Sequence, residues 1–446
     1  MQRIFSILNV IRLALFAIGY GLTGALVGGT LNRVMVVDIG LPVSLVGLFF
    51  ATPLFIAPLR AWVGYLSDAY PVLGKRREPY MIAGALVAGV GVILAILLLV
   101  NSPSTALLLA VGVFIAFLIH EFGRNLSHNA FQALLADKFT GNQRARAITL
   151  YEVATILGLT MGAGGIGRAL ETYDPGQLTM VTIGVSVITF VLALVAALGN
   201  EPRHDAAAEA VTTARSVPFT RALREIAVGD RQVRLFFVII ILTIIGTLAQ
   251  DVLLEPYGAL VMDMDVGDTT RLTAFWGLGV MTSMLLSGLL LIRFLGHMTT
   301  LRIGLVMTVI VFGGVIASGA LNNTGLFRGL VLLMGLGTGL AGASLLTGMV
   351  NFTTRARAGL LMGMWGIAMV FGRAMGGLIG GTIVDVMQAS GGSALIAYSM
   401  VFALEALLLV TALYLTTRLD VRAARAVEEE QGLQQQAGIG AGAVGL

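Results

Sequence analysis

Hydrophobic residues fill the chain in long runs, and short polar segments separate one run from the next. A helix of about 20 apolar residues, rising ~1.5 Å per residue, crosses the ~30 Å hydrocarbon core of a bilayer. These runs are too long for buried strands, so they are typical of membrane-spanning helices. The pattern predicts twelve such helices, at residues 13–37, 43–66, 79–100, 105–129, 147–169, 177–199, 235–258, 271–294, 300–320, 327–350, 359–385 and 394–416.

Positive charges fall mainly in alternate connections between these segments. The connections on one side hold only Arg33, Arg168, Arg271 and Arg328, whereas the other side, which includes both ends of the chain, holds most lysines and arginines. Because short cytoplasmic loops are enriched in Lys and Arg, the pattern places both termini in the cytoplasm. That placement requires an even number of crossings, as twelve helices provide.

The longest polar stretch divides the twelve predicted helices into two sets of six. We therefore expect an N-terminal half at 1–199, a cytoplasmic linker with an amphipathic helix at 200–234, a C-terminal half at 235–417 and a disordered cytoplasmic tail at 418–446. A repeat supports two related halves, since Gln-Arg-Ala-Arg-Ala at 143–147 returns as Thr-Arg-Ala-Arg-Ala at 354–358. The predicted fold is an all-α membrane protein of two six-helix halves.

Composition narrows the range of functions. Charged residues make up 12% of the chain, whereas soluble domains have about 25%. The absence of cysteine excludes disulfides and thiolate metal sites. No nucleophile motif or soluble catalytic domain is visible, and the basic residues follow membrane topology rather than a nucleic-acid stripe. We expect a protein that is embedded in a lipid bilayer. We do not expect it to be an enzyme, to hold a metal ion or to bind nucleic acid.

One polar loop carries a recognisable motif, Gly-Tyr-Leu-Ser-Asp at 64–68 followed by Gly-Lys-Arg-Arg at 74–77. It resembles the loop between helices two and three of major facilitator transporters, which implies a latch at the cytoplasmic gate. The basic residues would hold the inner side of the membrane and its anionic lipids. A plain basic loop is the alternative interpretation. The candidate gating residues are Gly64, Asp68, Gly74, Lys75, Arg76 and Arg77.

Longer segments resemble a more specific family. The segments at 32–42, 57–61, 77–80 and 249–258 look like the PucC/LhaA family, also called the bacteriochlorophyll delivery family, within the major facilitator superfamily. The resemblance covers about residues 10–415. It implies a protein that assists assembly of light-harvesting antennae, with bacteriochlorophyll as cargo and antenna polypeptides as partners. It also implies a bacterial inner membrane, either the plasma or the intracytoplasmic photosynthetic membrane.

Charged and polar residues inside the predicted spans are candidate site residues, because a buried charge costs ~2.5–3.5 kcal/mol on insertion scales. In the resembled fold, helices one, four, seven and ten line a central cavity, where several of these residues would meet. The alternative is structural, for example an ion pair of Glu121 with Arg60 or Arg124. The candidates are Asn32, Arg33, Arg60, His120, Glu121, Arg124, Asn125, His128, Gln250, Asp251, Glu255 and Arg373.

Two local features sharpen these candidates. Pro256 follows Asp251 and Glu255, which predicts a broken end of the seventh helix on the outer side. His120 and His128 lie on one face of the fourth helix, and a neutral imidazole can supply the axial ligand of a bacteriochlorophyll magnesium. The alternative for either histidine is a hydrogen bond across helices.

Three functions remain open from the sequence. The first is antenna assembly with pigment binding. The second is a proton-coupled transporter of a small solute, in which Glu121, Asp251 or Glu255 would change protonation. The third is a structural protein that contacts antenna helices through the glycine-rich faces of the fifth and eleventh helices.

Overall fold

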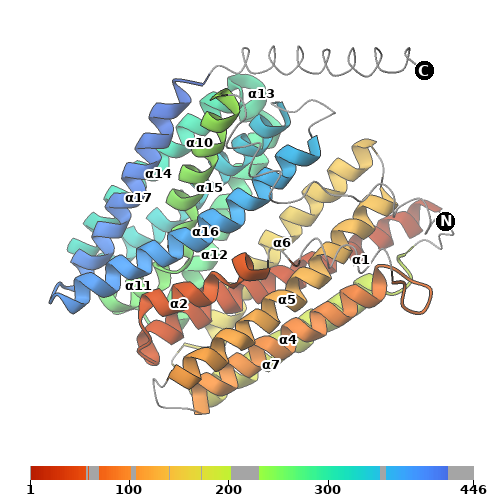
Figure 1. Ribbon diagram of the computed structural model, residues 1–446, viewed down its shortest axis with the longest axis horizontal. Coiled ribbons are helices and arrows are strands. Elements are labelled where there is room, and N and C mark those ends of the chain that lie inside the picture. Colours follow the sequence, from red (N-terminus) through yellow and green to blue (C-terminus); the bar gives the residue numbers. More distant parts are fainter. Residues whose placement is uncertain are drawn as a thin grey trace, which may run out of the picture.

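The computed structural model describes residues 2–56, 59, 70–101, 107–139, 141–171, 173–201, 231–351 and 358–419, which form helices joined by short turns (Figure 1). The first part contains α1 (Gln2–Gly24), the π-helices η1 (Ala25–Leu31) and η2 (Val34–Asp38), α2 (Val43–Phe50), α4 (Glu78–Asn101), α5 (Leu107–Lys138), α6 (Gly141–Ala169) and α7 (Pro175–Ala197). The second part contains α10 (Arg231–Leu248), the 3-10 turn η3 (Ala249–Asp251), α11 (Leu254–Met262), α12 (Val266–Leu286), the π-helix η4 (Ser287–Leu291), α13 (Ile292–Leu295), α14 (His297–Ala320), α15 (Thr324–Asn351), α16 (Ala358–Ala389) and α17 (Ala394–Thr416).

Helices occupy all the predicted spans wherever the structure describes them, so the all-α membrane fold is confirmed. Ten helices in the described ranges are long and apolar enough to cross a bilayer. The remaining two predicted spans correspond to shorter apolar helices, Val43–Ile56 and Arg234–Leu248. The rest of the predicted second span, most of the linker and the tail lie outside the described residues.

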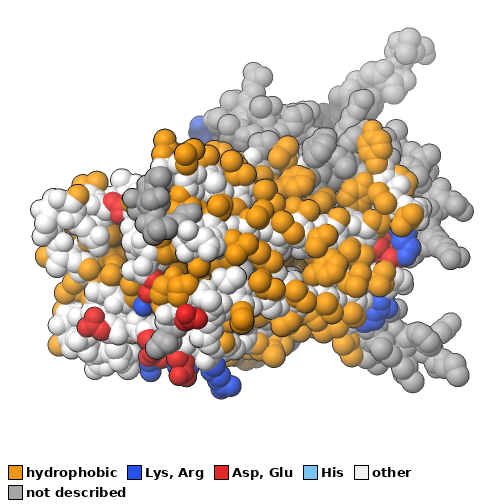
Figure 2. Space-filling model, turned by 90° about the horizontal axis from the view of Figure 1, so that it is seen from below, with side chains coloured by type: hydrophobic (Ala, Val, Ile, Leu, Met, Phe, Trp, Pro, Cys, Tyr) orange, Lys and Arg blue, Asp and Glu red, His pale blue; other side chains and the backbone are white. Residues whose placement is uncertain are grey.

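The surface of the bundle is apolar where a soluble protein would be polar. Figure 2 shows a broad hydrophobic band across the middle of one face, with the acidic and basic side chains lying outside it. Large side chains such as Met180, Ile310 and Leu407 are more than half exposed. Because a contiguous apolar surface of this extent is unfavourable in water, the band matches lipid chains. This chain is therefore a multi-pass membrane protein.

The helices form two bundles that lie side by side, α1–α7 and α10–α17 (Figure 1). We call the end where α1 begins and α17 ends the terminal end, and the opposite end the far end. The bundles meet through α2 against α16 and α6 against α12. At the far end Asp385 of α16 accepts hydrogen bonds from the backbone N–H groups of Val43 (2.9 Å) and Ser44 (2.8 Å), the first two residues of α2.

Glycine permits the close approach of helices from different bundles. A Cβ on Gly47 of α2 would lie 2.7 Å from the carbonyl oxygen of Gly377 in α16. A Cβ on Gly267 of α12 would lie 2.4 Å from the carbonyl oxygen of Gly167 in α6. Small residues of this kind are typical of helix contacts in membranes. In this protein such contacts join the two halves of the same chain.

Candidate functional site

A central cavity of about 240 Å³ lies between the two bundles. Its wall comes from α1, η1, α2, α5 and α6 on one side and from η3, α11, α12 and α16 on the other. Aromatic rings form part of this wall, and its charged, imidazole and amide side chains come from α5 and from the C-terminal bundle. The aromatic residues are Tyr20, Phe49, Phe50, Phe117 and Trp276, and the titratable or amide-bearing ones are His120, Glu121, Arg124, Gln250, Glu255 and Arg373.

The α5 wall is built around an ion pair. Arg124 Nη1 donates to Glu121 Oε1 over 2.9 Å, and the Arg124 guanidinium lies 4.4 Å from the ring centre of Tyr20 in α1. Asn125 Nδ2 donates to the backbone oxygen of Glu121 (2.8 Å) and approaches its Oε2 (3.4 Å). Of the two partners suggested for Glu121 in the structural alternative, Arg124 therefore forms the ion pair, within one helix rather than between helices. Arg60, the other suggested partner, lies outside the described residues.

The two α5 histidines have different surroundings. His120 is 1% exposed, lines the cavity, and places Nδ1 2.8 Å from the carbonyl oxygen of Ala88 in α4. His128 does not line the cavity. Its Nε2 lies 2.8 Å from the hydroxyl of Tyr151 in α6, and its ring packs against those of Tyr20 and Tyr151. His128 therefore follows the packing alternative, and only His120 remains at the candidate site.

The seventh predicted span is broken, but inside the bundle rather than at its outer end. The α-helix stops at Leu248, a 3-10 turn covers Ala249–Asp251, and α11 restarts at Leu254. Pro256 lies in the first turn of α11, where its missing N–H leaves no helical hydrogen bond unmade. The break brings Gln250 and Glu255 to the cavity wall. The side chain of Asp251 lies outside the described part of the structure.

Glu255 connects the two bundles at the cavity. Its Oε2 accepts a hydrogen bond from Asn32 Nδ2 (3.2 Å) at the end of η1, and its Oε1 accepts one from Thr273 of α12 (2.8 Å). Thr30 and Thr270 form a further hydroxyl contact of 3.2 Å beside it. Asn32 lies between the two π-helical segments of the first span, η1 and η2. Such segments are frequent at functional sites. Asn32 thus acts by holding Glu255.

Arg33 does not join this cavity, contrary to the prediction that it converges there. It forms an ion pair with Asp38 five residues later, and neither residue lines the cavity. The local pairing gives the guanidinium a counterion, which a charge needs wherever water is scarce, although Arg33 Nε has no hydrogen-bond partner among the described residues. By contrast Arg373 of α16 does reach the cavity wall, opposite Glu121. The sequence did not single out Tyr20, Thr273 or Trp276, because uncharged residues inside an apolar run carry no distinguishing signal.

Several buried polar atoms of the cavity wall have no hydrogen-bond partner within the described part of the chain. They belong to four residues, which come from both bundles. Leaving such an atom unsatisfied costs about 1–3 kcal/mol, so native proteins usually pair it with a ligand, a water or another group. The cavity wall therefore offers polar atoms that a ligand or a water can contact. The atoms are His120 Nε2, Arg124 Nε, Gln250 Oε1 and Nε2, and Trp276 Nε1.

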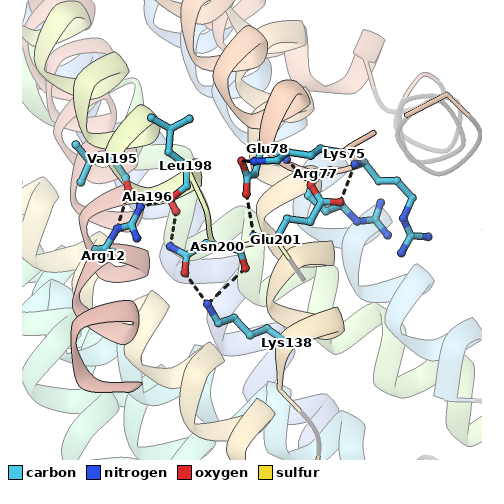
Figure 3. Close-up of polar contacts among 11 residues, drawn as sticks. Arg12, Lys75, Arg77, Glu78, Lys138, Val195, Ala196, Leu198, Asn200 and Glu201 are labelled. Carbon is cyan, nitrogen blue, oxygen red and sulfur yellow. Dashed lines mark hydrogen bonds and ion pairs between the residues drawn. The ribbon is translucent and has the colours of Figure 1, made fainter. Parts of the chain in front are cut away.

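The loop motif is partly described, and one of its basic residues, Arg77, is buried against protein. Figure 3 shows Glu201, just after α7, beside the start of α4. Its carboxylate accepts the N–H groups of Arg76 (2.7 Å), Arg77 (2.9 Å) and Glu78 (3.2 Å), while Glu78 Oε1 accepts the N–H of Glu201 (2.9 Å). Arg77 is 6% exposed and pairs with Asp137 at 3.1 Å. In this state Arg77 is therefore held by protein, and the binding of anionic lipid by the basic residues of the loop stays a prediction.

The rest of the network ties the terminal end of the N-terminal bundle together (Figure 3). Lys75 pairs with Glu78, Gly74 takes a left-handed conformation (φ 73°), and Lys138 Nζ donates to Asn200 Oδ1. Burial and the nearby Arg12 lower the pKa of Lys138, against an opposite effect of Glu78. The remaining gating residues, Gly64 and Asp68, lie outside the described residues, so the gating role stays a prediction.

Solved structures with the same architecture are membrane transporters. A point variant of the nucleoside transporter NupG superposes with a TM-score of 0.72 at 13% identity, covering 92% of this chain and 99% of that one. The inward-open xylose transporter XylE from E. coli has a TM-score of 0.67 at 13% identity, covering 95% and 99%. At such identities the likeness shows the fold alone, which is that of the major facilitator transporters.

Sequence relatives define the family. The family model described as PUCC protein matches residues 30–424. Protein PucC of Rhodobacter capsulatus is 31% identical over 436 residues, which cover 94% of this chain and 93% of the relative. The bacteriochlorophyll synthase 44.5 kDa chain of the same species is 30% identical over 424 residues, which cover 92% and 95%. With a match over nearly its whole length and relatives at this identity, the chain belongs to the PucC family.

Proposed function

We propose that this protein assists the assembly of light-harvesting antennae in a photosynthetic membrane by binding bacteriochlorophyll and delivering it to antenna polypeptides. The central cavity is the observation that carries the proposal, because its aromatic wall holds buried polar atoms from both bundles that lack protein partners. The name of one relative, a bacteriochlorophyll synthase chain, supports this cargo. The role is binding and delivery rather than catalysis.

The volume of the cavity limits how bacteriochlorophyll can bind. At about 240 Å³ it is smaller than the ~300–1,000 Å³ that drug-sized ligands occupy, and bacteriochlorophyll with its ester tail is larger than such ligands. The whole pigment therefore does not fit in this state. Binding requires that the two bundles separate further or that the tail extends out of the cavity. Both are compatible with two bundles that contact each other through a few helices.

The proposal includes a bacterial inner-membrane location with both termini in the cytoplasm, which the distribution of Lys and Arg supports. Reporter fusions at each end test it directly. Opposite locations for the two ends would contradict both the topology and the even number of crossings.

A cavity-filling variant tests pigment binding. Gly28 lines the cavity, and a Cβ there would meet no atom within 4 Å, so Gly28→Leu fills the cavity without striking a neighbouring helix. Gly184 of α7 has equally open surroundings and does not line the cavity, so Gly184→Leu is the matched control. We expect the tagged wild-type protein and the control to co-purify with near-infrared-absorbing pigment, and Gly28→Leu to lose it together with antenna absorbance in cells. A pigment-free wild-type protein would refute the proposal.

Proton-coupled transport of a small solute is the second candidate. It is favoured by two acids at the cavity, Glu121 and Glu255, and by a likeness in fold to the D-xylose–proton symporter (TM-score 0.66, 15% identity, 91% of this chain and 97% of that one). Uptake into proteoliposomes driven by a pH gradient distinguishes the two functions. Solute uptake that collapses with a protonophore, in a protein that carries no pigment, would favour the transporter.

A further inference from the structure

We propose that His120 is the axial ligand of the magnesium ion of a tetrapyrrole bound in the central cavity, and that His128 is not. This inference rests on the proposed function and names the residue through which the pigment is held. It is argued from the hydrogen bonds of the two histidines and from the absence of companion ligands among the described residues.

The imidazole of His120 is arranged as metal-bound histidines are. Its Nδ1 donates to the carbonyl oxygen of Ala88 over 2.8 Å, because a carbonyl can only accept. That bond fixes the tautomer and leaves the lone pair on Nε2. Histidine ligands in metal sites almost always donate their other N–H to a carboxylate or backbone carbonyl in this way. Nε2 is buried and has no hydrogen-bond partner in the described chain.

The packing of α4 against α5 holds this geometry. Gly91 lets the two helices approach so closely that a Cβ there would lie 2.3 Å from the backbone nitrogen of His120. The Ala88 carbonyl therefore stays in reach of the ring. A histidine that served only to join α4 and α5 would need just this one bond, and it would not need to lie at the wall of the central cavity.

The described surroundings offer no set of ligands for a free metal ion. No group of three or more His, Cys, Asp or Glu side chains able to hold a metal occurs among the described residues. The neighbouring acid, Glu121, is already paired with Arg124. A single imidazole with no companion suits a metal whose other positions are already filled. A magnesium tetrapyrrole is such a ligand, since its four ring nitrogens occupy the equatorial plane and leave an axial position open.

The opposite wall of the cavity offers hydrogen-bonding groups for the periphery of the tetrapyrrole ring. Trp276 Nε1 is a hydrogen-bond donor and the Gln250 amide is both donor and acceptor, and each is buried without a partner in the part of the chain that the structure describes. Bacteriochlorophylls carry carbonyl groups at the ring periphery that accept such bonds. Aromatic residues, Phe49 and Phe117 among them, complete an apolar wall for the macrocycle. Because Nε2 is buried in this state, ligation accompanies the same widening of the cavity that the size of the pigment requires.

The test measures magnesium coordination in full-length protein reconstituted in nanodiscs with added bacteriochlorophyll a. Wild type is expected to show one axial imidazole by resonance Raman ring modes and near-infrared absorption. His120→Gly should bind the pigment about 10- to 100-fold more weakly, the loss seen even when an outer partner of a metal-bound histidine is removed. Added imidazole should restore both affinity and spectrum, which also shows that the variant is folded.

His128→Phe is the matched control, because His128 lies two turns further along α5 and bonds Tyr151 instead of facing the cavity. Its affinity and spectrum should equal those of wild type. Unchanged coordination in His120→Gly without imidazole would overturn the assignment of His120 while pigment binding itself stands. A loss of the axial signal in His128→Phe alone would overturn it as well. A wild-type protein that binds no pigment would instead refute the proposed function.

Discussion

The cap that Asp385 places on α2 allows a quantitative prediction about movement of the two bundles. The carboxylate of Asp385 accepts the N–H groups of Val43 and Ser44 at 2.9 and 2.8 Å, across the contact between bundles at the far end. These are among the N–H groups that a helix start leaves without an internal partner. If the far end opens, α2 and α16 separate and the cap is lost. The cap therefore stabilises the closed far end relative to an open one.

The size of the effect follows from the chemistry of helix caps. Replacing a capping residue by alanine costs about 0.5–2 kcal/mol, and bonds to a charged acceptor lie toward the upper part of that range. A loss of one to two kcal/mol changes a two-state equilibrium by a factor of about 5 to 30. Asp385→Ala should therefore raise the ratio of open to closed far ends by that factor.

Distances between spin labels measure this ratio. The chain has no cysteine, so single cysteines can be introduced without background labelling. Gln177 at the start of α7 and Gln388 near the end of α16 are both exposed and belong to different bundles at the far end. Thr382→Ala is the control, because the Thr382 hydroxyl donates only to Leu378 of its own helix. An unchanged distance distribution in Asp385→Ala would refute the reasoning that this cap holds the far end closed.

Three further predictions address packing and polar contacts. Gly47→Ala places a methyl 2.7 Å from a carbonyl oxygen of α16 and should lower the melting temperature, whereas Gly184→Ala, with no atom within 4 Å, should leave it nearly unchanged in a thermal-shift assay. Glu201→Ala leaves three N–H groups at the start of α4 without their acceptor and should speed proteolysis at the 70–78 loop, with an intact digestion pattern as the contrary result. Glu255→Gln should lower antenna absorbance in cells without abolishing expression, because it weakens two hydrogen bonds at the cavity; wild-type absorbance would remove Glu255 from the site.

The sequence predicted the helices well and the polar contacts poorly, for a physical reason. A span is specified by some 20 consecutive residues that must all tolerate lipid, so its signal is strong and local. A polar contact depends on how the helix is rotated about its axis and on which residue of another segment faces it. A local sequence pattern contains neither piece of information. Arg33 illustrates this, since its partner Asp38 lies on the same short segment and draws it away from the cavity.

Other residues escaped prediction because their partners are distant in sequence. Glu201 was not among the candidate residues, yet it accepts hydrogen bonds at the start of a helix more than a hundred residues earlier. Asp385 likewise caps a helix in the other half of the chain. His120 and His128 share one face of one helix, and only the facing residues, Ala88 and Tyr151, separate their roles. The spacing of residues in the sequence therefore identified the candidate histidines. Only their tertiary contacts show which of them lies at the cavity.

The two cavity acids bear on the choice between pigment binding and proton-coupled transport. Protonating Glu121 would leave the part-buried guanidinium of Arg124 without its counterion, which is unfavourable because the charge has limited access to water. Glu255 accepts bonds from Asn32 and Thr273, and a proton on its carboxylate would compete with those donors. Both acids are thus held in place as acceptors in this state. The groups with unpartnered atoms in the described wall are an imidazole, an amide, an indole and one guanidinium nitrogen, which suit a bound guest better than a transferred proton.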